Sequence, residues 1–419
     1  MRAVLCRVES FSDQVDSWVA DAIRGGIRHF GDLLRGLPGV YPVDVAASVR
    51  RLSFGGDITR PVASRLLVGA NCVGPVIERQ QSLPAPHPLD YDWRFTATSS
   101  AHLFQRLGQV ANPGDTLVCL GAPSVYEEAL RQGAARRAAL VDANSAIVSH
   151  FLSRAQWLRV WRSDLLTDPI PALHSSVVMA DPPWYFDQMV GFLWAASQIC
   201  TVGGHVFVSL PPKGTRPGVV SEVGRLIGLA RAMGFDVDRL DCGAVQYESP
   251  PFERNALRAA GIHLSSYDWR CGDLCILRLR AANNQPRPLP PRSQGKWVEE
   301  ELSGMRVRLR KKGIGLFADP VLTSLVDGDI LPSVSRRHPL RQSVDVWTAG
   351  NRVFSCAGTN ILRQVIRALA RGQNPVLRVA SALNRVLTHR ERQLIVVAAR
   401  QMTALARQER RDFCYAGVG

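Results

Sequence analysis

The chain has 419 residues, 46% of them hydrophobic, and a formal net charge of +15 at pH 7. This length is enough for two or three domains with substantial cores. No apolar run approaches the ~20 residues of a membrane span, and the start lacks the apolar core of a signal peptide. The nine cysteines are scattered without a Cys-x-x-Cys pair, which favours reduced thiols and argues against structural zinc. We therefore expect a cytoplasmic protein with no metal site and no membrane partner.

The positive charge is concentrated in the C-terminal third. From Ala281 onward the chain has 23 lysines and arginines against 10 acidic residues, a balance of +13 that leaves +2 for residues 1 to 280. A concentrated basic region suits a polyanion, because neutralising phosphates releases counterions. We therefore expect nucleic acid, DNA or RNA, as a partner of this region. Only four residues are lysine, so the arginine surplus could also reflect genomic base composition.

The first 90 residues are predicted to form a small helical module and a linker. Val43 to Leu52 and Ile58 to Val68 have helical spacing around a Gly-Gly turn, which allows a helix-turn-helix but favours an ordinary helical hairpin. The stretch from Ser82 to Asp90 contains three prolines and is predicted to be a linker.

Residues 91 to 281 alternate strand and helix patterns, which is typical of βαβ units. The fold class we predict is α/β, with a Rossmann-like, doubly wound and mostly parallel sheet. The predicted helices are Tyr126 to Gln132, Ala143 to Ala155 and Phe186 to Ile199, and Gly203-Gly204 is expected to form the turn into the strand at His205. The predicted strands are Thr116 to Leu120, Ala139 to Val141, Leu158 to Trp161, Ser176 to Ala180, His205 to Ser209, Leu274 to Leu279 and a segment near Phe235 to Leu240.

A second linker, rich in proline, is predicted for residues 282 to 295, followed by a basic C-terminal α+β domain over residues 296 to 419. Trp297 to Lys312 alternates Met, Val and Leu with arginines and predicts a strand with one basic face. The end of the chain, from Asn360 to about Gln408, predicts helices that are interrupted near Gly372 to Pro375.

The most specific motif is the segment Asp181-Pro182-Pro183-Trp184. The preceding residues, Val177 to Ala180, form a short apolar run typical of a strand that is buried on both faces. Proline cannot continue a hydrogen-bonded ladder, so the chain must leave the sheet at Asp181. This places Asp181 at a carboxyl edge, where open α/β sheets bind ligands. The alternative is a strand exit with a capping carboxylate and a buried indole.

Three further residues are predicted at the same edge. Gly121 ends the first strand of the series, and Asp142 follows 21 positions later, close to the ~20-residue spacing at which an acid meets a nucleoside ribose. Asp164 follows the third strand and could accept from an adenine amino group. Acids at strand ends also serve as turn formers and helix caps, so both interpretations of Asp142 and Asp164 stay open.

These features resemble the class I S-adenosylmethionine-dependent methyltransferases that modify exocyclic amino groups, above all those acting on adenine N6. The resemblance covers roughly Asp92 to Arg280. It implies that Asp181 and the Pro182 carbonyl accept hydrogen bonds from the target amine, that Pro183 shapes the loop and that Trp184 stacks on the base. It also implies S-adenosyl-L-methionine as the cofactor, held near Gly121, Ala122, Ser124, Asp142, Asp164 and Thr96.

The predicted cofactor loop departs from that family. Its usual GxGxG-like pattern is reduced to Gly121, which is followed by Ala122 and by Pro123, a residue without an N–H group. Upstream, the segment Tyr91 to Thr98 stands where such enzymes have residues that contact the methionine moiety, so Thr96 or Thr98 is the candidate there. A solvent-side turn is the alternative.

Two other functions fit part of this pattern. The chain is similar to the aminopropyltransferases that make branched polyamines, whose acidic cluster follows the loop glycine. Here the sequence after Gly121 has no acid before Glu127, and a chain of charge +15 suits a polycationic amine poorly. The third alternative is a non-catalytic binding subunit that keeps the fold with a degraded cofactor loop. Such subunits have a base loop without its acid, whereas Asp181 is intact in this chain. We favour a methyltransferase acting on an exocyclic amine, and whether it needs a protein partner stays open.

Overall fold

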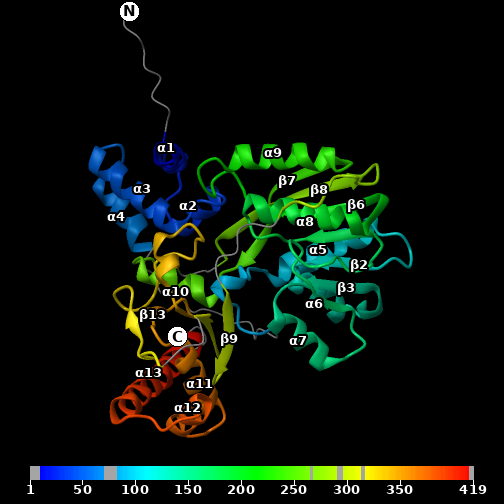
Figure 1. Cartoon of the computed structure of the whole chain (residues 1–419). Coiled ribbons are helices and arrows are strands. Elements are labelled where there is room, and N and C mark those ends of the chain that lie inside the picture. Colours follow the sequence, from blue (N-terminus) through cyan, green and yellow to red (C-terminus); the bar gives the residue numbers. More distant parts are fainter. Residues whose placement is uncertain (1–9, 70–82, 265–267, 290–295, 313–316, 415–419) are drawn as a thin grey trace, which may run out of the picture. The chain divides into compact units, whose positions relative to one another are not determined.

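The computed structural model describes residues 10–69, 83–264, 268–289, 296–312 and 317–414 (Figure 1). The predictions for the start of the chain, for part of the first linker and for residues 290–295 of the second linker lie outside these ranges. The chain folds into two compact units. Unit 1 joins residues 1–72, 93–249 and 264–291, and unit 2 joins residues 73–92, 250–263 and 292–419. The domain boundaries that the sequence predicts remain a proposal.

Unit 1 is built on an eight-stranded sheet with the order β1-β7-β8-β6-β5-β2-β3-β4. The five adjacent strands β4, β3, β2, β5 and β6 are parallel. Strand β8 runs antiparallel to both β6 and β7, and the short β1 is antiparallel to β7. The predicted α/β class with a mostly parallel, Rossmann-like sheet is confirmed. The strands are β1 (Arg94–Phe95), β2 (Leu117–Leu120), β3 (Ala138–Asp142), β4 (Val160–Arg162), β5 (Ser175–Ala180), β6 (Cys200–Leu210), β7 (Phe235–Glu248) and β8 (Arg270–Leu279).

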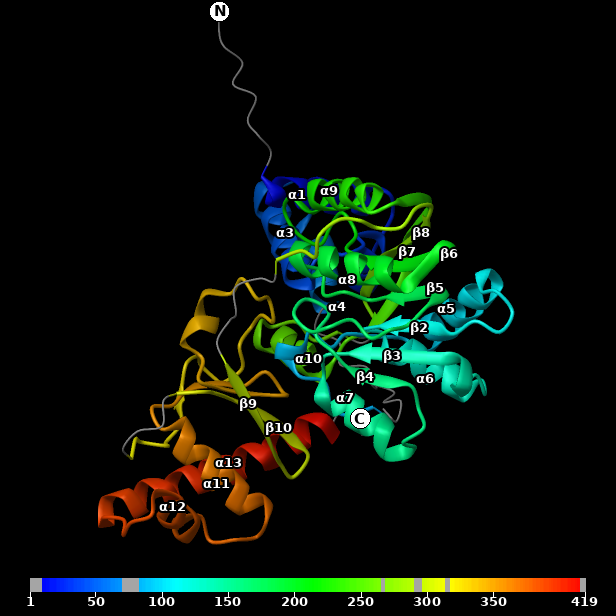
Figure 2. The ribbon, with the colours of Figure 1, turned by 45° about the vertical axis from the view of Figure 1, so that its right-hand side comes forward.

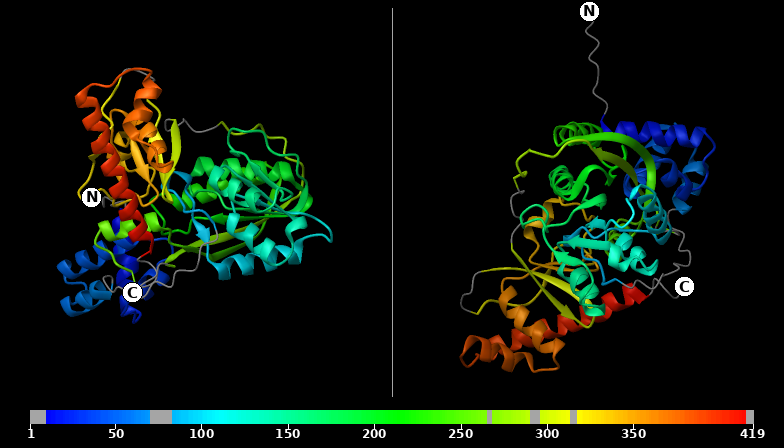
Figure 3. Two further views of the ribbon diagram at one scale, coloured as in Figure 1. Left: turned by 90° about the horizontal axis from the view of Figure 1, so that it is seen from below. Right: turned by 90° about the vertical axis from the view of Figure 1, so that its right-hand side faces the viewer.

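Helices cover both faces of this sheet, as Figures 2 and 3 show. Helices α8 (Phe186–Ile199) and α9 (Val219–Ala232) lie on one face. Helices α5 (Ala97–Val110), α6 (Pro123–Arg131) and α7 (Ser145–Arg154) lie on the other. This double covering explains why β2 and β5 are buried at every position, because a parallel sheet between two helical layers exposes neither face.

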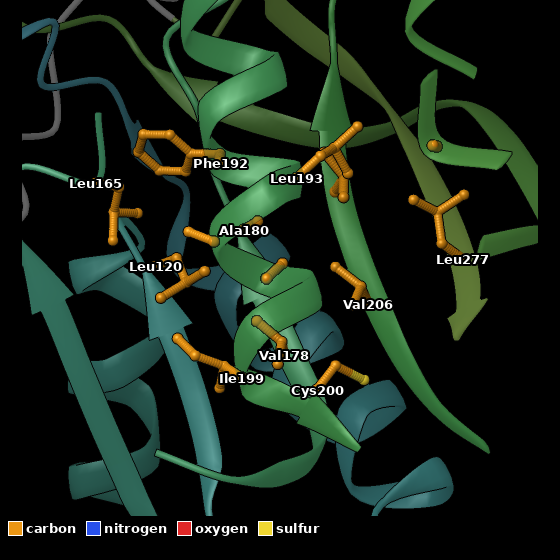
Figure 4. Packing of buried hydrophobic residues seen from close by; sticks show 14 of the residues in the cluster. Leu120, Leu165, Val178, Ala180, Phe192, Leu193, Ile199, Cys200, Val206 and Leu277 are labelled. Atoms are coloured by element: carbon orange, nitrogen blue, oxygen red, sulfur yellow. The ribbon is translucent and has the colours of Figure 1, made fainter. Parts of the chain in front are cut away.

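The main core of unit 1 lies between α8 and the central strands (Figure 4). Leu193 and Ile199 of α8 pack with Leu120, Val178 and Val206 of three neighbouring strands. Burying an aliphatic side chain of this size contributes roughly 1.5–3 kcal/mol. The α8 contacts therefore fix the carboxyl ends of β2 and β5, where the candidate site lies.

Among the described residues, four α-helices precede the sheet: α1 (Phe11–Arg24), α2 (Phe30–Gly36), α3 (Pro42–Gly55) and α4 (Arg60–Gly69). The predicted hairpin of two helices around the Gly-Gly turn is the α3–α4 pair, where Gly56 adopts φ +85°. The prediction for Gly203-Gly204 was wrong, because β6 begins at Cys200 and runs through both glycines. Its pairing with β5 is irregular in this stretch, between Ser175 and Val177.

Unit 2 contains a five-stranded antiparallel sheet, a short helix and a helical end. The sheet order is β11-β13-β12-β10-β9, and the interrupted helical end predicted from the sequence is confirmed. The elements are α10 (Pro251–Ala259), β9 (Trp297–Leu302), β10 (Met305–Arg310), β11 (Thr323–Ser324), β12 (Val346–Thr348), β13 (Val353–Ser355), α11 (Thr359–Ala370), α12 (Pro375–Leu383) and α13 (His389–Cys414).

The single strand predicted over Trp297 to Lys312 was wrong. The segment is a hairpin of β9 and β10, turning at Ser303 and Gly304, which adopt φ 53° and 85°. Its arginines do not form an open basic face either. Arg306 is 4% exposed and contacts both Asp90 and Glu299 at 2.7 Å. Because a buried guanidinium must be paired with carboxylates, the charge of Arg306 is neutralised inside the unit.

In the part of the chain that the structure describes, no helix combines the length and the apolar character that a membrane crossing requires.

Candidate active site

The parallel register brings three of the predicted site residues together. Leu120 pairs with Val141 of β3 and with Ala180 of β5. Gly121 and Asp181 therefore follow aligned positions at the same sheet edge, next to Asp142 at the end of β3. Two backbone hydrogen bonds connect these ends: Asp181 N–H donates to the Leu120 carbonyl at 3.0 Å, and Gly121 N–H donates to the Val141 carbonyl at 2.9 Å.

The carboxylate of Asp181 is held by two hydroxyl groups, one from β6 and one from β7. Its Oδ1 accepts a hydrogen bond from the Tyr247 hydroxyl of β7 at 2.7 Å and another from Ser209 of β6. Tyr247 is 2% exposed. Burial, together with the negative charge of Asp181, raises the pKa of Tyr247 well above its usual value. Tyr247 therefore stays a neutral donor, and the Asp181 carboxylate has a fixed orientation at the sheet edge.

The two prolines give the loop after β5 its shape. Pro182 is buried and Pro183 is half-buried. The Pro183 carbonyl accepts from Tyr185 N–H at 2.7 Å, in a turn that leads into α8. No hydrogen bond from the described residues reaches the Pro182 carbonyl. That carbonyl is an acceptor adjacent to Asp181 in the chain.

The indole of Trp184 is packed rather than open, with 7% of its surface exposed. It meets the ring of Tyr247 edge-on, with centroids 5.4 Å apart and an interplanar angle of 89°. The guanidinium of Arg270 lies 4.5 Å from the Trp184 ring and 3.9 Å from the Trp93 ring, between the two indoles. A Cβ at Gly272 would lie 2.7 Å from Trp184. Stacking of a base on the Arg270 side of Trp184 would therefore require Arg270 to move.

The turn after β2 packs tightly against the Asp181 loop. Gly121 adopts φ +59°, and a Cβ there would lie 2.9 Å from the Phe192 ring and 3.2 Å from the Asp181 carbonyl oxygen. Only glycine combines this backbone conformation with this space. Ala122 is fully buried, and Pro123 is the first residue of α6, a position that tolerates the missing N–H group. The two loops therefore form one compact edge.

The candidates Thr96, before α5, and Ser124, in the first turn of α6, both form local hydrogen bonds near this edge. Thr96 caps α5, with its hydroxyl accepting from Ser99 N–H at 3.2 Å. Ser124 Oγ accepts from Phe95 N–H at 3.3 Å, which ties β1 to the start of α6. The segment before α5 therefore contacts the start of α6, where the side chain of Thr96 is buried and that of Thr98 is exposed.

Asp142 and Asp164 both form turns. Asp142 Oδ1 accepts from Asn144 N–H at 2.7 Å, and Asn144 in turn caps α7. Asp164 Oδ1 accepts from Leu166 N–H at 3.0 Å, while its own N–H donates to Asp168 at 2.9 Å. Asp142 remains half-buried at the edge beside Gly121. A nucleoside-containing cofactor fits the glycine turn and a carboxylate at the next strand end, whereas Asp164 lies two residues beyond the end of β4.

Sequence reasoning missed Ser209, Tyr247 and Arg270. Ser209 carried a usable signal, because it ends the strand predicted next to that of Asp181. Tyr247 and Arg270 carried none, since they are opposite each other on β7 and β8, strands whose antiparallel pairing no motif or spacing indicates.

The sequence matches no protein-family model and no curated protein. Among solved structures, it is similar to the branched-chain polyamine synthase of Thermus thermophilus, in complex with N4-aminopropylspermidine and 5'-methylthioadenosine. The identity is 14% over 67% of this chain and 91% of that chain, with a TM-score of 0.50. A putative RNA methyltransferase from Pyrococcus horikoshii matches at 16% identity over 52% of this chain and 99% of its own, with a TM-score of 0.32. At this identity, the similarity to the synthase establishes a shared fold over two-thirds of the chain.

Proposed function

We propose that unit 1 transfers a methyl group from S-adenosyl-L-methionine to an exocyclic amine, with adenine N6 in DNA or RNA as the substrate. The observation that carries this proposal is the Asp181 carboxylate, which Ser209 and Tyr247 orient beside the Gly121 turn. A fixed acceptor suits an amine, and the adjacent glycine turn suits a nucleoside cofactor.

To catalyse this transfer, the chain would have to position a weak nucleophile. An exocyclic amine has its lone pair delocalised into the ring. Acceptors on its two N–H bonds favour the pyramidal form, in which the lone pair is localised on nitrogen. Asp181 Oδ and the Pro182 carbonyl would be these acceptors, and a preorganised carboxylate acts most strongly where water is excluded. A base within a duplex would have to be flipped out to reach them.

The cofactor would be held by the Gly121 turn and by Asp142. It would supply an electrophilic methyl group on a sulfonium centre. Asp142 would accept from ribose hydroxyls, as an acid at this spacing does in nucleotide-binding sheets. Ala122, Ser124 and Thr96 would shape the wall beside the turn, and Asp164 would accept from the adenine amino group if its turn leaves an oxygen in reach.

Nucleic acid as the substrate is supported by the charge of unit 2. Between Thr359 and Cys414 the sequence has eleven arginines and three carboxylates. Apart from Arg400 and Arg407, five of these arginines are exposed and form no ion pair within the described residues: Arg371, Arg390, Arg392, Arg410 and Arg411. Exposed, unneutralised arginines attract phosphates.

Aminopropyl transfer is the second candidate, and the shared fold with the branched-chain polyamine synthase favours it. Two features of this chain oppose it. The turn after Gly121 lacks an acid before Glu127, and a chain of net charge +15 suits a polycationic amine poorly. A non-catalytic binding subunit is the third candidate, and the intact Asp181 opposes it.

The test is calorimetric titration of the full chain with S-adenosylmethionine and with its decarboxylated form. We expect binding of the first form and a loss of about tenfold or more with Asp142→Ala, because a ribose acceptor is removed. Asp57→Ala, which changes an exposed acid between α3 and α4, is the control and should leave binding unchanged. Preference for the decarboxylated form would favour aminopropyl transfer, and binding of neither would favour the non-catalytic subunit.

A further inference from the structure

Unit 2 has a groove along α13 that the proposed methyl transfer does not use. It runs between α13 and the turn that joins α11 to α12, three helices that lie side by side (Figures 1 and 2). Its volume is about 590 Å³. Its floor is aliphatic and is formed by Leu369, Pro375, Val376, Val396, Ala399 and Ala404. We call it the α13 groove.

The charge at the α13 groove is entirely positive. Arg400 and Arg407 line it, both are exposed, and no acidic side chain is among its lining residues in the described chain. Neither arginine has an ion pair within the described residues. Because they are seven positions apart on one helix, they lie on the same face, about 10.5 Å apart along the axis.

The carboxylates of this region cannot neutralise these arginines, because each has another partner. Glu391 pairs with Arg385 at 2.6 Å and Asp412 pairs with Arg352 at 2.6 Å. Glu409 is 1% exposed and accepts from the Gly350 N–H at 3.1 Å. Arg400 and Arg407 can therefore pair with the acidic groups of a ligand from outside the unit.

We propose that the α13 groove binds an amphipathic helix of a protein partner, whose apolar face covers the aliphatic floor and whose acidic residues pair with Arg400 and Arg407. Helices dock into apolar grooves through side chains spaced at helical intervals. Two carboxylates seven residues apart on the incoming helix match the spacing of the two arginines, and arginine–carboxylate pairs are charge-assisted hydrogen bonds.

The chemistry of the floor separates this ligand from nucleic acid. Grooves that bind single strands use aromatic side chains on which bases stack, and no aromatic residue is among the described residues that line this one. Val396, 40% exposed on α13, instead offers the aliphatic contact that a leucine-rich helix face needs. The proposal does not depend on the proposed methyl transfer.

The experiment uses the full chain and a fluorescein-labelled helical peptide of about 18 residues, with a leucine face and two glutamates seven positions apart. Its matched control peptide has glutamine at those two positions. We expect the glutamate peptide to bind about tenfold more tightly at low salt, and this difference to shrink as salt is raised, because the added pairs are exposed.

Variants locate the binding. Arg400→Glu with Arg407→Glu should abolish binding of the glutamate peptide and create binding of a lysine version, whereas Arg390→Glu, an exposed arginine of the same helix outside the groove, should change neither. Val396→Asp should weaken binding of both the glutamate and the glutamine peptide, because it places a charge on the aliphatic floor of the groove. Equal binding of the glutamate and glutamine peptides would overturn the proposal. So would an oligonucleotide that binds the wild type and is lost in the Arg400 and Arg407 variant while peptide binding persists.

Discussion

The Tyr247 hydroxyl donates to Oδ1 of Asp181 at 2.7 Å, and so connects β7 to the loop that follows β5. The bond therefore joins β7, an antiparallel strand near one side of the sheet, to the carboxyl end of the parallel strand β5. Because the Tyr247 hydroxyl is buried, water cannot take its place as the donor. The orientation of Asp181 therefore depends on this hydrogen bond.

Tyr247→Phe should therefore destabilise the protein by about 2 kcal/mol, because a buried bond to a charged group is lost and an acceptor is left short of a donor. It should also lower the methyl-transfer rate more than it changes cofactor binding. Urea unfolding and cofactor titration measure the two effects. Tyr126→Phe is the control: Tyr126 is fully buried, and its hydroxyl has no hydrogen-bond partner in the described structure. Removing that hydroxyl should leave stability unchanged or raise it. Equal losses in the two variants would contradict the role given to Tyr247.

Gly121→Ala should be costly for two reasons. The conformation at φ +59° is strained for alanine by about 1–2 kcal/mol, and the new methyl group would meet the Phe192 ring at 2.9 Å, which adds overpacking. Gly133→Ala separates the backbone strain from the overpacking, because Gly133 has φ +75° but open space where a Cβ would lie. We expect Gly133→Ala to show the strain alone. Thermal unfolding of both variants gives the comparison, and an equal cost at both positions would mean that the contact with Phe192 is not tight.

Glu409 should make the stability of unit 2 depend on pH. Burial raises the pKa of this carboxyl from 4.5 to about 7, against the lowering effects of Thr348, Arg352 and Gly350. The folded state therefore holds its proton more strongly than the unfolded state. The contribution is fully present below pH 4.5 and is lost as pH rises through about 7.

Urea unfolding between pH 4.5 and 7.5 should show this loss, up to about 3 kcal/mol, and Glu409→Gln should flatten it. Glu391→Gln is the matched control. Its half-buried carboxyl has a pKa lowered to about 2, mainly by the hydrogen bond from Arg385, so it does not titrate in this range. A slope that survives in Glu409→Gln would assign the pH dependence to another group.

The parts of the site that follow from local patterns could be predicted from the sequence. Gly121, Asp142 and Asp181 end apolar runs of parallel strands, and parallel ends must meet at one edge. The turn roles of Asp142 and Asp164 belong to the same local chemistry. The hairpin at Ser303-Gly304 also had a local signal, the Ser-Gly pair, which the alternation of arginines around it obscured.

The parts that depend on distant pairing could not be predicted. Tyr247 reaches Asp181 only because β8 is inserted antiparallel between β6 and β7. Arg306 is internal only because Asp90, from more than 200 positions earlier, reaches it. In both cases the contact is set by tertiary packing, which hydrophobic periodicity within a segment does not encode.

The most direct test of the central claim is methyl transfer from isotopically labelled S-adenosylmethionine to adenine-containing DNA and RNA oligonucleotides, followed by mass spectrometry of the nucleosides. We predict labelled N6-methyladenine with the wild-type chain and a loss of about a hundredfold with Asp181→Asn, which keeps the shape but weakens the acceptor. Label on no amine with the wild-type chain, or equal labelling by Asp181→Asn, would contradict the claim.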